Sequence, residues 1–325
     1  MTLSQPPEWA RHKWVWIGFP SHADLWKEDL EPAREEVIAF ARAVYCDGAG
    51  EEVRLVAAVP ASARAAQRMA PWATVVQEIF GDIWLRDTGP IIVNGRGLNE
   101  AASFRFNGWG GKYDLEGDDT IGLRLAETAD IEPCRYEWIL EGGAIDTDGT
   151  GLYVTTEQCL LNPNRNQGIS RGDVEARLSQ ALGATRVLWL GEGLLNDHTD
   201  GHVDNLARFI GENRLAIPVA AGADDPNAAV YEDARRRAEA AGVEVVPLPS
   251  PGRVLRDGEI VPASYMNFYI GNAAVVVPVY GAANDGAAVE AVGALFPGRK
   301  AVGIQADHVL TGGGSFHCIS QQMPE

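Results

Sequence analysis

The sequence predicts an α/β protein in which five similar units close into a ring. Short β-hairpin patterns recur along the chain, each is followed by a stretch with helical periodicity, and a further strand follows most of these stretches. The repeat is roughly 50–65 residues long, which is typical of arrays and propellers. The units share a pattern but no sequence identity, so an ordinary α+β domain with several hairpins is the alternative.

The N-terminal region predicts strands and helices in alternation. Residues 14–19 are aromatic and β-branched, which favours a strand, and Pro20 ends it. A helix is expected over 28–45, because apolar residues recur there at nearly helical spacing. Next come a buried strand, a short helix and another strand, at 53–59, 61–69 and 74–80.

Four hairpins follow, each with Gly, Asn or Asp in its turn. Their strands are expected at 91–93 and 98–106, 143–146 and 152–156, 204–210 and 215–219, and 268–270 and 274–277, joined by turns at 94–97, 147–151, 211–213 and 271–272. Helices are expected at 117–129, 170–182, 226–241 and 284–296, and further strands at 185–190, 243–247 and 300–304.

The two ends of the chain are expected to pair. Residues 314–320 begin a fifth hairpin, but no partner strand follows them. The N-terminal strand, helix and strand are the parts that this unit lacks. Pairing the ends would complete the fifth unit and leave no single edge exposed.

Composition narrows the class of protein and of partner. The 325 residues suit one large domain or two ordinary ones, and the net charge of −18 makes nucleic acid and anionic membranes poor partners. We expect a cytoplasmic protein: no apolar run approaches a membrane span, the N-terminus has no apolar signal core, and the four cysteines form no C-x-x-C pair. An acidic surface can attract a small cation, although it also simply favours solubility.

The C-terminal motif at 312–318 contains three glycines followed by Ser-Phe-His-Cys. Glycines allow the backbone to approach another group closely, because they lack a Cβ atom. We expect Cys318 to be a nucleophile; the alternative is a buried structural thiol, as most free cysteines are.

Other reactive side chains fall where the predicted hairpins begin. In a closed ring these positions converge on the axis, which would bring together Asp87, Glu141, His202, Asp204 and Cys318. Each has a simpler interpretation, such as a surface charge, a turn residue or a satisfied histidine–carboxylate pair. His202 and Asp204, two residues apart on a strand, would share one face.

A carboxylate cluster around a thiol indicates a cationic substrate. Carboxylates repel both a thiolate and a developing oxyanion, which argues against amide hydrolysis, whereas a planar guanidinium offers several N–H donors to them. Asp87 and Asp204 could hold its nitrogens, with its carbon over the sulfur of Cys318. The carboxylates would raise the pKa of the resting thiol, and the arriving guanidinium would then favour the thiolate.

Seven motifs in this order closely resemble the agmatine deiminase family, within the bacterial-type peptidylarginine deiminases and the wider group of guanidine-modifying enzymes. They lie at 84–90, 106–113, 140–143, 155–166, 199–205, 265–270 and 312–318. The resemblance implies a single domain over 1–325 with the five-bladed α/β propeller (pentein) fold, built from ββαβ-type modules.

The resemblance also implies the roles of the site residues. Cys318 would be the nucleophile, His202 the general acid and base, Asp87 and Asp204 the guanidinium ligands, and Glu141 a further hydrogen-bonding partner. Agmatine would give N-carbamoylputrescine and ammonia through a covalent amidino-thioether, with no metal or organic cofactor, in a step of putrescine and polyamine synthesis.

The far end of the substrate is less well specified. The loop 191–198 has lost acidic residues expected in the family, and Ile83 stands where a small residue is expected. Candidates to bind a distal ammonium are Asp82, Asp197 and Asp200. Trp84 and Trp109 could pack on the aliphatic chain or the cation, or could be core aromatics.

Three alternative functions remain. The stretch 197–204 is dense in possible metal ligands, which would suit a metallohydrolase. A guanidine-binding protein without catalysis would also keep the carboxylates. Among enzymes, the alternative is a deiminase of peptidyl-arginine or another small guanidine. A homo-oligomer is compatible with the sequence.

Overall fold

The computed structural model describes residues 3–95 and 98–325, and four of its sheets repeat one pattern. In each, an antiparallel hairpin is followed by a helix and by a third strand that pairs in parallel with the hairpin's second strand. These sheets contain β4 (Ile91–Gly95), β5 (Leu98–Arg105) and β6 (Pro133–Ile139); β7 (Ile145–Thr147), β8 (Leu152–Thr156) and β9 (Arg186–Leu190); β10 (Arg208–Gly211), β11 (Arg214–Val219) and β12 (Glu244–Pro249); and β15 (Tyr269–Ile270), β16 (Ala274–Val279) and β17 (Lys300–Gln305).

The fifth unit is assembled from both ends of the chain. Strand β1 (His12–Phe19) pairs antiparallel with β18 (Ser320–Pro324) and parallel with β2 (Glu52–Ala57), to which β3 (Thr74–Gln77) adds a fourth strand. The predicted pairing of the two ends is therefore confirmed. Cys318 lies two residues before β18, which is an edge strand of this sheet.

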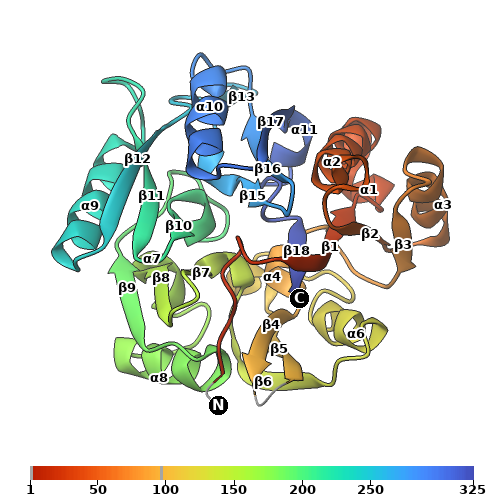
Figure 1. Cartoon of the computed structure of the whole chain (residues 1–325), viewed down its shortest axis with the longest axis horizontal. Coiled ribbons are helices and arrows are strands. Elements are labelled where there is room, and N and C mark those ends of the chain that lie inside the picture. The colour runs from red at the N-terminus through yellow and green to blue at the C-terminus, as the bar shows by residue number, and fades with distance from the viewer. Residues whose placement is uncertain (1–2, 96–97) are drawn as a thin grey trace.

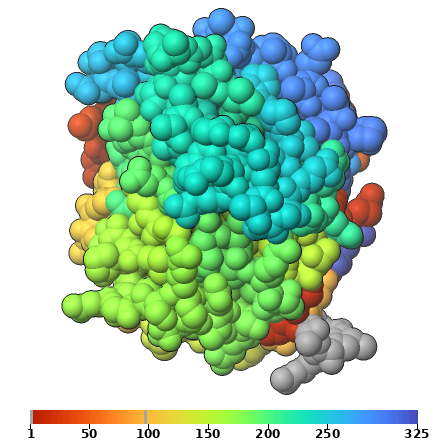
Figure 2. Space-filling view, turned by 90° about the vertical axis from the view of Figure 1, so that its left-hand side faces the viewer, coloured from red at the N-terminus to blue at the C-terminus, as the bar shows by residue number. Residues whose placement is uncertain are grey.

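Each unit carries one of the predicted helices. They are α2 (Leu30–Tyr45), α6 (Ile121–Thr128), α8 (Arg171–Leu182), α9 (Ala228–Ala240) and α10 (Asp285–Leu295), with bounds close to those expected. Figure 1 shows the five units following one another around the middle of the molecule, with these helices towards the outside. Figure 2 shows the second and third units, β7–β9 and β10–β12 with their helices, packed side by side on one face, where α9 contacts β9.

Several short elements were not predicted. They are strand β6, the hairpin of β13 (Leu255–Arg256) and β14 (Glu259–Ile260), and the helices α1 (Ala23–Trp26), α4 (Leu85–Thr88), α5 (Gly108–Gly111), α7 (Glu157–Leu160) and α11 (Asp307–Leu310). Helix α3 (Pro60–Met69) matches its prediction. In the predicted turn 94–97, residues 96–97 lie outside the described part of the chain.

The first strands of three hairpins begin later than expected. Single turns of 3-10 helix, η3 (Gly142–Ala144), η4 (Val203–Asn205) and η5 (Tyr265–Asn267), replace the predicted start of each strand or immediately precede it. The expectation that His202 and Asp204 share a face of a strand is therefore wrong. Both side chains are buried all the same, because the turn directs them into the molecule instead of along a sheet.

The core supports the residues next to Cys318. Helix α2 buries Ala33, Val37, Phe40, Ala41 and Val44. Phe40 stacks on Phe316 with ring centroids 4.8 Å apart, and both rings are fully buried. Burying an aromatic side chain of this size stabilises a fold by about 1.5–3 kcal/mol. The packing of α2 thus holds the backbone two residues before the thiol.

Within residues 3–95 and 98–325, no helix is both long and apolar enough to cross a bilayer.

Candidate active site

The glycine triplet brings the loop of Cys318 into close contact with Trp84. A Cβ atom on Gly314 would lie 2.7 Å from the Trp84 indole and 3.1 Å from the Cys318 Sγ, and one on Gly312 would lie 2.6 Å from the same indole. Side-chain carbons do not approach this closely, so both positions require glycine. The close approach expected from this motif is observed, and the groups approached are Trp84 and the thiol.

The Cys318 thiol is buried among polar groups. The Asn267 Nδ2 donates to the Sγ at 3.0 Å, and the Sγ lies 3.5 Å from the Asp204 Oδ2. Burial, together with the charges of Asp204 and Asp87, raises the pKa of the Cys318 thiol well above its ordinary value. The resting sulfur is therefore protonated, as a cation-activated nucleophile requires.

Asn267 also fixes the backbone at this point. Its Oδ1 accepts from the backbone N–H of His317 at 2.9 Å and of Cys318 at 3.3 Å. It was not among the predicted site residues, although it lies in one of the seven motifs. A fully polar side chain within the apolar stretch 265–270 is the signal that could have identified it.

Asp87, His202 and Asp204 converge on Gly143. A Cβ atom there would lie 2.7 Å from the Asp87 Oδ1, 2.7 Å from the His202 Nδ1 and 3.1 Å from the Asp204 Oδ2. The Gly143 N–H donates to the Asp87 Oδ1 at 2.9 Å. The structure thus brings together side chains from two units, and the second glycine of the Leu-Glu-Gly-Gly motif, from a third unit, provides the space between them.

The carboxyl group of Asp87 is held by Trp109. The indole N–H of Trp109 donates to the Oδ2 at 2.8 Å, and the His202 Nδ1 lies 3.6 Å from the Oδ1. Burial, with the neighbouring charges of Asp204 and Glu141, raises the pKa of Asp87 well above its usual range. A nearby guanidinium would lower this pKa again, so Asp87 is suited to a cationic ligand.

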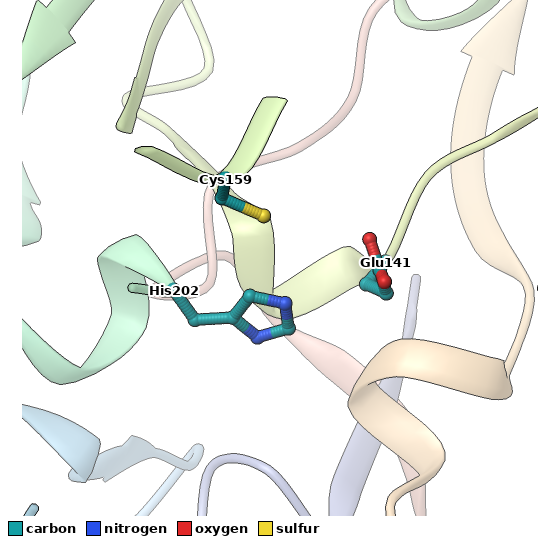
Figure 3. Close-up of side chains that lie close together, drawn as sticks. All are labelled: Glu141, Cys159 and His202. Atoms are coloured by element: carbon teal, nitrogen blue, oxygen red, sulfur yellow. The ribbon is translucent and has the colours of Figure 1, made fainter. Parts of the chain in front are cut away.

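Glu141, Cys159 and His202 form a second cluster (Figure 3). One ligating atom from each lies within 4.8 Å of the others, and all three residues are buried. Within the described residues, the Glu141 Oε2 and the His202 Nε2 have no hydrogen-bond partner. Burial lowers the pKa of His202 to about 3, so its imidazole is neutral near pH 7 and can accept or donate a proton.

Arg165 balances the charge of this cluster. Its Nε donates to the Glu141 Oε1 at 2.7 Å, and it also pairs with Asp200. Burial raises the pKa of Glu141, and Arg165 opposes that rise. Arg165 and Cys159 were not predicted as site residues, although both belong to the motif at 155–166.

The stretch 197–204 does not form one set of metal ligands. The Asp197 carboxylate accepts from Thr199 and Asn205, and Asp200 pairs with Lys112 and Arg165. In the described structure, only His202 of this stretch belongs to a group of three ligand atoms. That group also lies against the Arg165 guanidinium through Glu141, and a fixed cation opposes metal binding.

A cavity of about 340 Å³ leads to the thiol. It is lined by Cys318, Asp87, Trp84, Trp109 and Asp82, among others. Three of the four predicted substrate-binding residues, Trp84, Trp109 and Asp82, therefore line it. Asp200 does not: it lies outside this lining and binds the Lys112 Nζ at 2.6 Å.

Acidic and aromatic groups surround Asp82. Its Oδ1 accepts from the Trp26 indole at 3.1 Å, and its Oδ2 accepts from the Trp84 indole at 2.7 Å. Burial raises the pKa of Asp82 to about 6. Glu28 and Asp29 also line the cavity, so its walls are suited to a small cation.

Comparison with known proteins places the chain in a family. The Porphyromonas-type peptidyl-arginine deiminase family matches residues 4–324. The agmatine deiminase of Stutzerimonas stutzeri (strain A1501) is 35% identical over 352 residues, covering 98% of this chain and 95% of the relative.

Solved structures agree with this assignment. The agmatine deiminase of Enterococcus faecalis superimposes with a TM-score of 0.93 at 32% identity, over 100% of this chain and 96% of that one. A cysteine-to-serine variant of the C. jejuni agmatine deiminase with substrate bound gives 0.91 at 28% identity, over 99% and 96%. The chain therefore belongs to the Porphyromonas-type peptidyl-arginine deiminase family.

Proposed function

We propose that this protein hydrolyses the guanidinium group of agmatine to N-carbamoylputrescine and ammonia, with Cys318 as the nucleophile. One observation carries the proposal: a buried thiol, a neutral histidine and two carboxyl groups from different units lie together beside one acidic cavity. The relatives named as agmatine deiminases support the choice of agmatine.

Substrate binding would activate the thiol. The Asp204 Oδ1 has no partner among the described residues, and Asp87 is poised to ionise beside a cation. A guanidinium held by these two carboxylates through paired N–H donors would place its carbon near the Cys318 Sγ. Its positive charge would stabilise the thiolate, and the thiol proton would pass to the neutral His202.

The reaction would proceed in two stages. The Sγ bonds to the guanidinium carbon, His202 gives its proton to a terminal nitrogen, and the C–N bond breaks to release ammonia. The amidino-thioether that remains is attacked by a water whose proton goes to His202. The C–S bond then breaks while the remaining hydroxyl proton passes to the sulfur, which restores the thiol and leaves a urea group, N-carbamoylputrescine; His202 gives its proton to the released ammonia. Glu141, with a carboxylate oxygen within 4.8 Å of an imidazole nitrogen of His202, would assist these proton transfers.

The cavity favours agmatine over free arginine. The distal ammonium of agmatine would meet Asp82 and the indoles of Trp26 and Trp84. The carboxylate of free arginine would instead face Asp82, Glu28 and Asp29, which repel it and outnumber Lys27 in the cavity lining. Of the three predicted candidates for the ammonium site, Asp197 and Asp200 lie outside the cavity lining, so Asp82 is the proposed partner.

The proposed assignment extends to the architecture and the compartment. The repeated unit and its arrangement around the middle of the molecule (Figure 1) support a single domain over 1–325 with a five-bladed α/β propeller fold. The four free cysteines support a cytoplasmic location, where thiols stay reduced.

The test is ammonia release from agmatine, free arginine, a peptide with C-terminal arginine, and methylguanidine. Cys318→Ser removes the nucleophile, and Cys134→Ser is the matched control at an exposed thiol. Turnover of agmatine that is lost only in Cys318→Ser is the expected result. Faster turnover of another of these compounds would make that compound the assigned substrate in place of agmatine. Activity that persists in Cys318→Ser would overturn the mechanism.

A further inference from the structure

The N-terminal segment crosses the middle of the molecule before β1 begins (Figure 1). Within it, Glu8 has a buried carboxylate. The Glu8 Oε1 accepts from the Ile270 N–H at 2.9 Å and lies 3.0 Å from the Arg208 Nη2. The Glu8 Oε2 accepts from the Arg86 Nη2 at 3.2 Å and lies 2.8 Å from the His317 Nε2. Glu8 does not line the substrate cavity, so its contacts are with protein groups.

His317 lies between two carboxylates. Its Nδ1 is 2.8 Å from the Asp204 Oδ2, its Nε2 is 2.8 Å from the Glu8 Oε2, and the residue is 2% exposed. An ionised carboxylate only accepts hydrogen bonds, so an imidazole that bonds two of them must donate from both nitrogens, as the imidazolium does. This histidine directly precedes the nucleophile in sequence, and the reaction scheme above does not use it.

The contact with His317 determines how Asp204 faces the substrate. The Asp204 Oδ2 accepts a hydrogen bond from the His317 Nδ1 at 2.8 Å and another from the Asn267 Nδ2 at 3.4 Å. The Oδ1 has no partner among the described residues, although Asp204 is fully buried. A buried, unpartnered carboxylate oxygen is costly unless a ligand completes it. The bond to His317 thus leaves one oxygen free for a guanidinium N–H.

We propose that His317 is a positioning residue for the reaction proposed above: held by Glu8, it orients Asp204, keeps it ionised and leaves its Oδ1 open to the substrate. The inference rests on the proposed function. The direction of the Asp204 titration agrees with it: burial favours the neutral acid, but the hydrogen bond and charge of His317, together with Arg208, lower the pKa of Asp204.

Other charged or titratable groups also lie near Asp204, Glu8 and His317. They are Asp87, Cys318 and Asp197 towards Asp204, Arg86 and Arg208 towards Glu8, and Asp146 towards His317. Asp87 and Asp197 oppose the ionisation of Asp204. When the imidazolium is removed, Arg208 remains near Asp204, but the balance of charge shifts towards Asp87 and Asp197, so protonation of Asp204 becomes easier.

Two substitutions separate the two bonds of the imidazole. In His317→Gln the amide nitrogen can reach the place of Nε2, which keeps the bond to Glu8 and loses the one to Asp204. In His317→Asn it can reach the place of Nδ1, which keeps the bond to Asp204 without the charge. His12→Gln is the matched control, because His12 is also buried and lies 3.1 Å from a carboxylate, that of Glu51, away from the cavity.

The measurement is the pH profile of kcat/KM for agmatine in the Asp82→Asn background, where titration of Asp82 near pH 6 cannot set the acid limb, with thermal unfolding recorded for each variant. We expect His317→Gln to lose roughly 100-fold in kcat/KM at pH 7 and to move its acid limb upward by about one pH unit, the size of a lost ion-pair effect. His317→Asn should lose less activity. Glu8→Gln should shift the limb in the same direction, and His12→Gln should not shift it.

An acid limb that stays in place in His317→Gln, with activity falling only in step with stability, would overturn the inference. A second readout does not depend on turnover: calorimetric binding of agmatine to Cys318→Ser, with and without His317→Gln, over the same pH range. If wild type binds agmatine but never turns it over, the proposed function fails, and this readout still decides the role of His317. If Cys318→Ser binds no agmatine at any pH, the positioning of Asp204 for a guanidinium is refuted.

Discussion

The indole N–H of Trp109 donates to the Asp87 Oδ2 at 2.8 Å. This bond depends on an unusual backbone, because Trp109 has φ +53° between Gly108 and Gly110, whose φ values are also positive. The glycines let the chain turn tightly enough to present the indole to a carboxyl group 22 residues away in sequence. Trp109 thereby leaves the Asp87 Oδ1 facing His202 and Gly143.

Trp109→Phe should lower kcat/KM for agmatine by roughly 10- to 100-fold, the value of one hydrogen bond to a charged group. The change removes the N–H but keeps a ring in the cavity wall. Since the bond lowers the pKa of Asp87, its loss also favours the protonated acid. Steady-state kinetics at pH 7 and pH 9 measure both effects. Trp189→Phe, which removes an indole bond to Glu175 instead, should leave kcat/KM within a factor of about two.

His202→Asn should reduce kcat by roughly 10²- to 10⁴-fold, as expected when a general acid and base is lost. Because the pKa of His202 is about 3, wild type should show no ionisation of this imidazole between pH 5 and pH 8. Stopped-flow and steady-state assays at several pH values test both statements. His22→Asn, at a half-buried histidine bonded to the Phe80 carbonyl, is the control. A kcat retained in His202→Asn would remove this residue from the mechanism.

Asp82→Asn should raise KM for agmatine by roughly 10- to 100-fold, because it removes the charge opposite the ammonium, and should leave methylguanidine unaffected. The pKa of Asp82 is raised to about 6, so the group is neutral below pH 6 and ionised above it. Wild-type KM for agmatine should therefore rise as the pH falls below 6. Parallel KM measurements on both substrates decide this, and equal changes for the two would exclude Asp82 as the ammonium site.

Alkylation of Cys318 by iodoacetamide in the free enzyme should keep accelerating about tenfold per pH unit through pH 9, because only the thiolate reacts. Its pKa is raised by burial and by Asp204 and Asp87, whereas free cysteine, with a pKa of about 8.5, is close to its full rate there. Inactivation rates followed by mass spectrometry give the profile. A plateau at or below that of free cysteine would mean that the thiol needs no substrate to ionise.

Phe316→Ala should destabilise the fold by about 3–5 kcal/mol, the usual cost of removing a buried aromatic ring. Phe316 is fully buried and stacks on Phe40. Urea unfolding measures the change in the free energy of unfolding. Leu195→Ala, at a side chain that is 44% exposed, should change it by less than about 0.5 kcal/mol. A small loss for Phe316→Ala would mean that the loop before Cys318 does not depend on α2.

Much of the fold followed from local patterns. The turns with Gly, Asn and Asp and the five longer helices were predicted close to their observed bounds, because they depend on residues near one another in sequence. Strand β6 was not predicted, because its residues 133–137 are exposed or only partly buried and lack a continuous apolar pattern. The predicted strands at 143–146 and 204–210 begin with residues that belong to the 3-10 turns η3 and η4, because buried residues in a tight turn resemble strand residues in sequence.

Only some of the residues of the candidate site can be predicted from the sequence. Cys318, Asp87, His202 and Asp204 are recognisable as reactive side chains near glycines. Asn267 gave only a weak signal, and nothing local marks Glu8, whose carboxylate meets His317 309 residues later, a contact that exists only after the two ends of the chain pair.

The sequence by itself determined the alternation of hairpins and helices, the glycines that permit close approach, and the types of side chain available for chemistry. Only the tertiary structure decided which oxygen of Asp204 is free, that His202 is neutral, and that Asp82 lines the cavity while Asp200 pairs with Lys112. The physical reason is the separation along the chain over which each interaction acts. Backbone preferences act between neighbours in the chain, whereas burial and charge act through space on groups that the fold brings together.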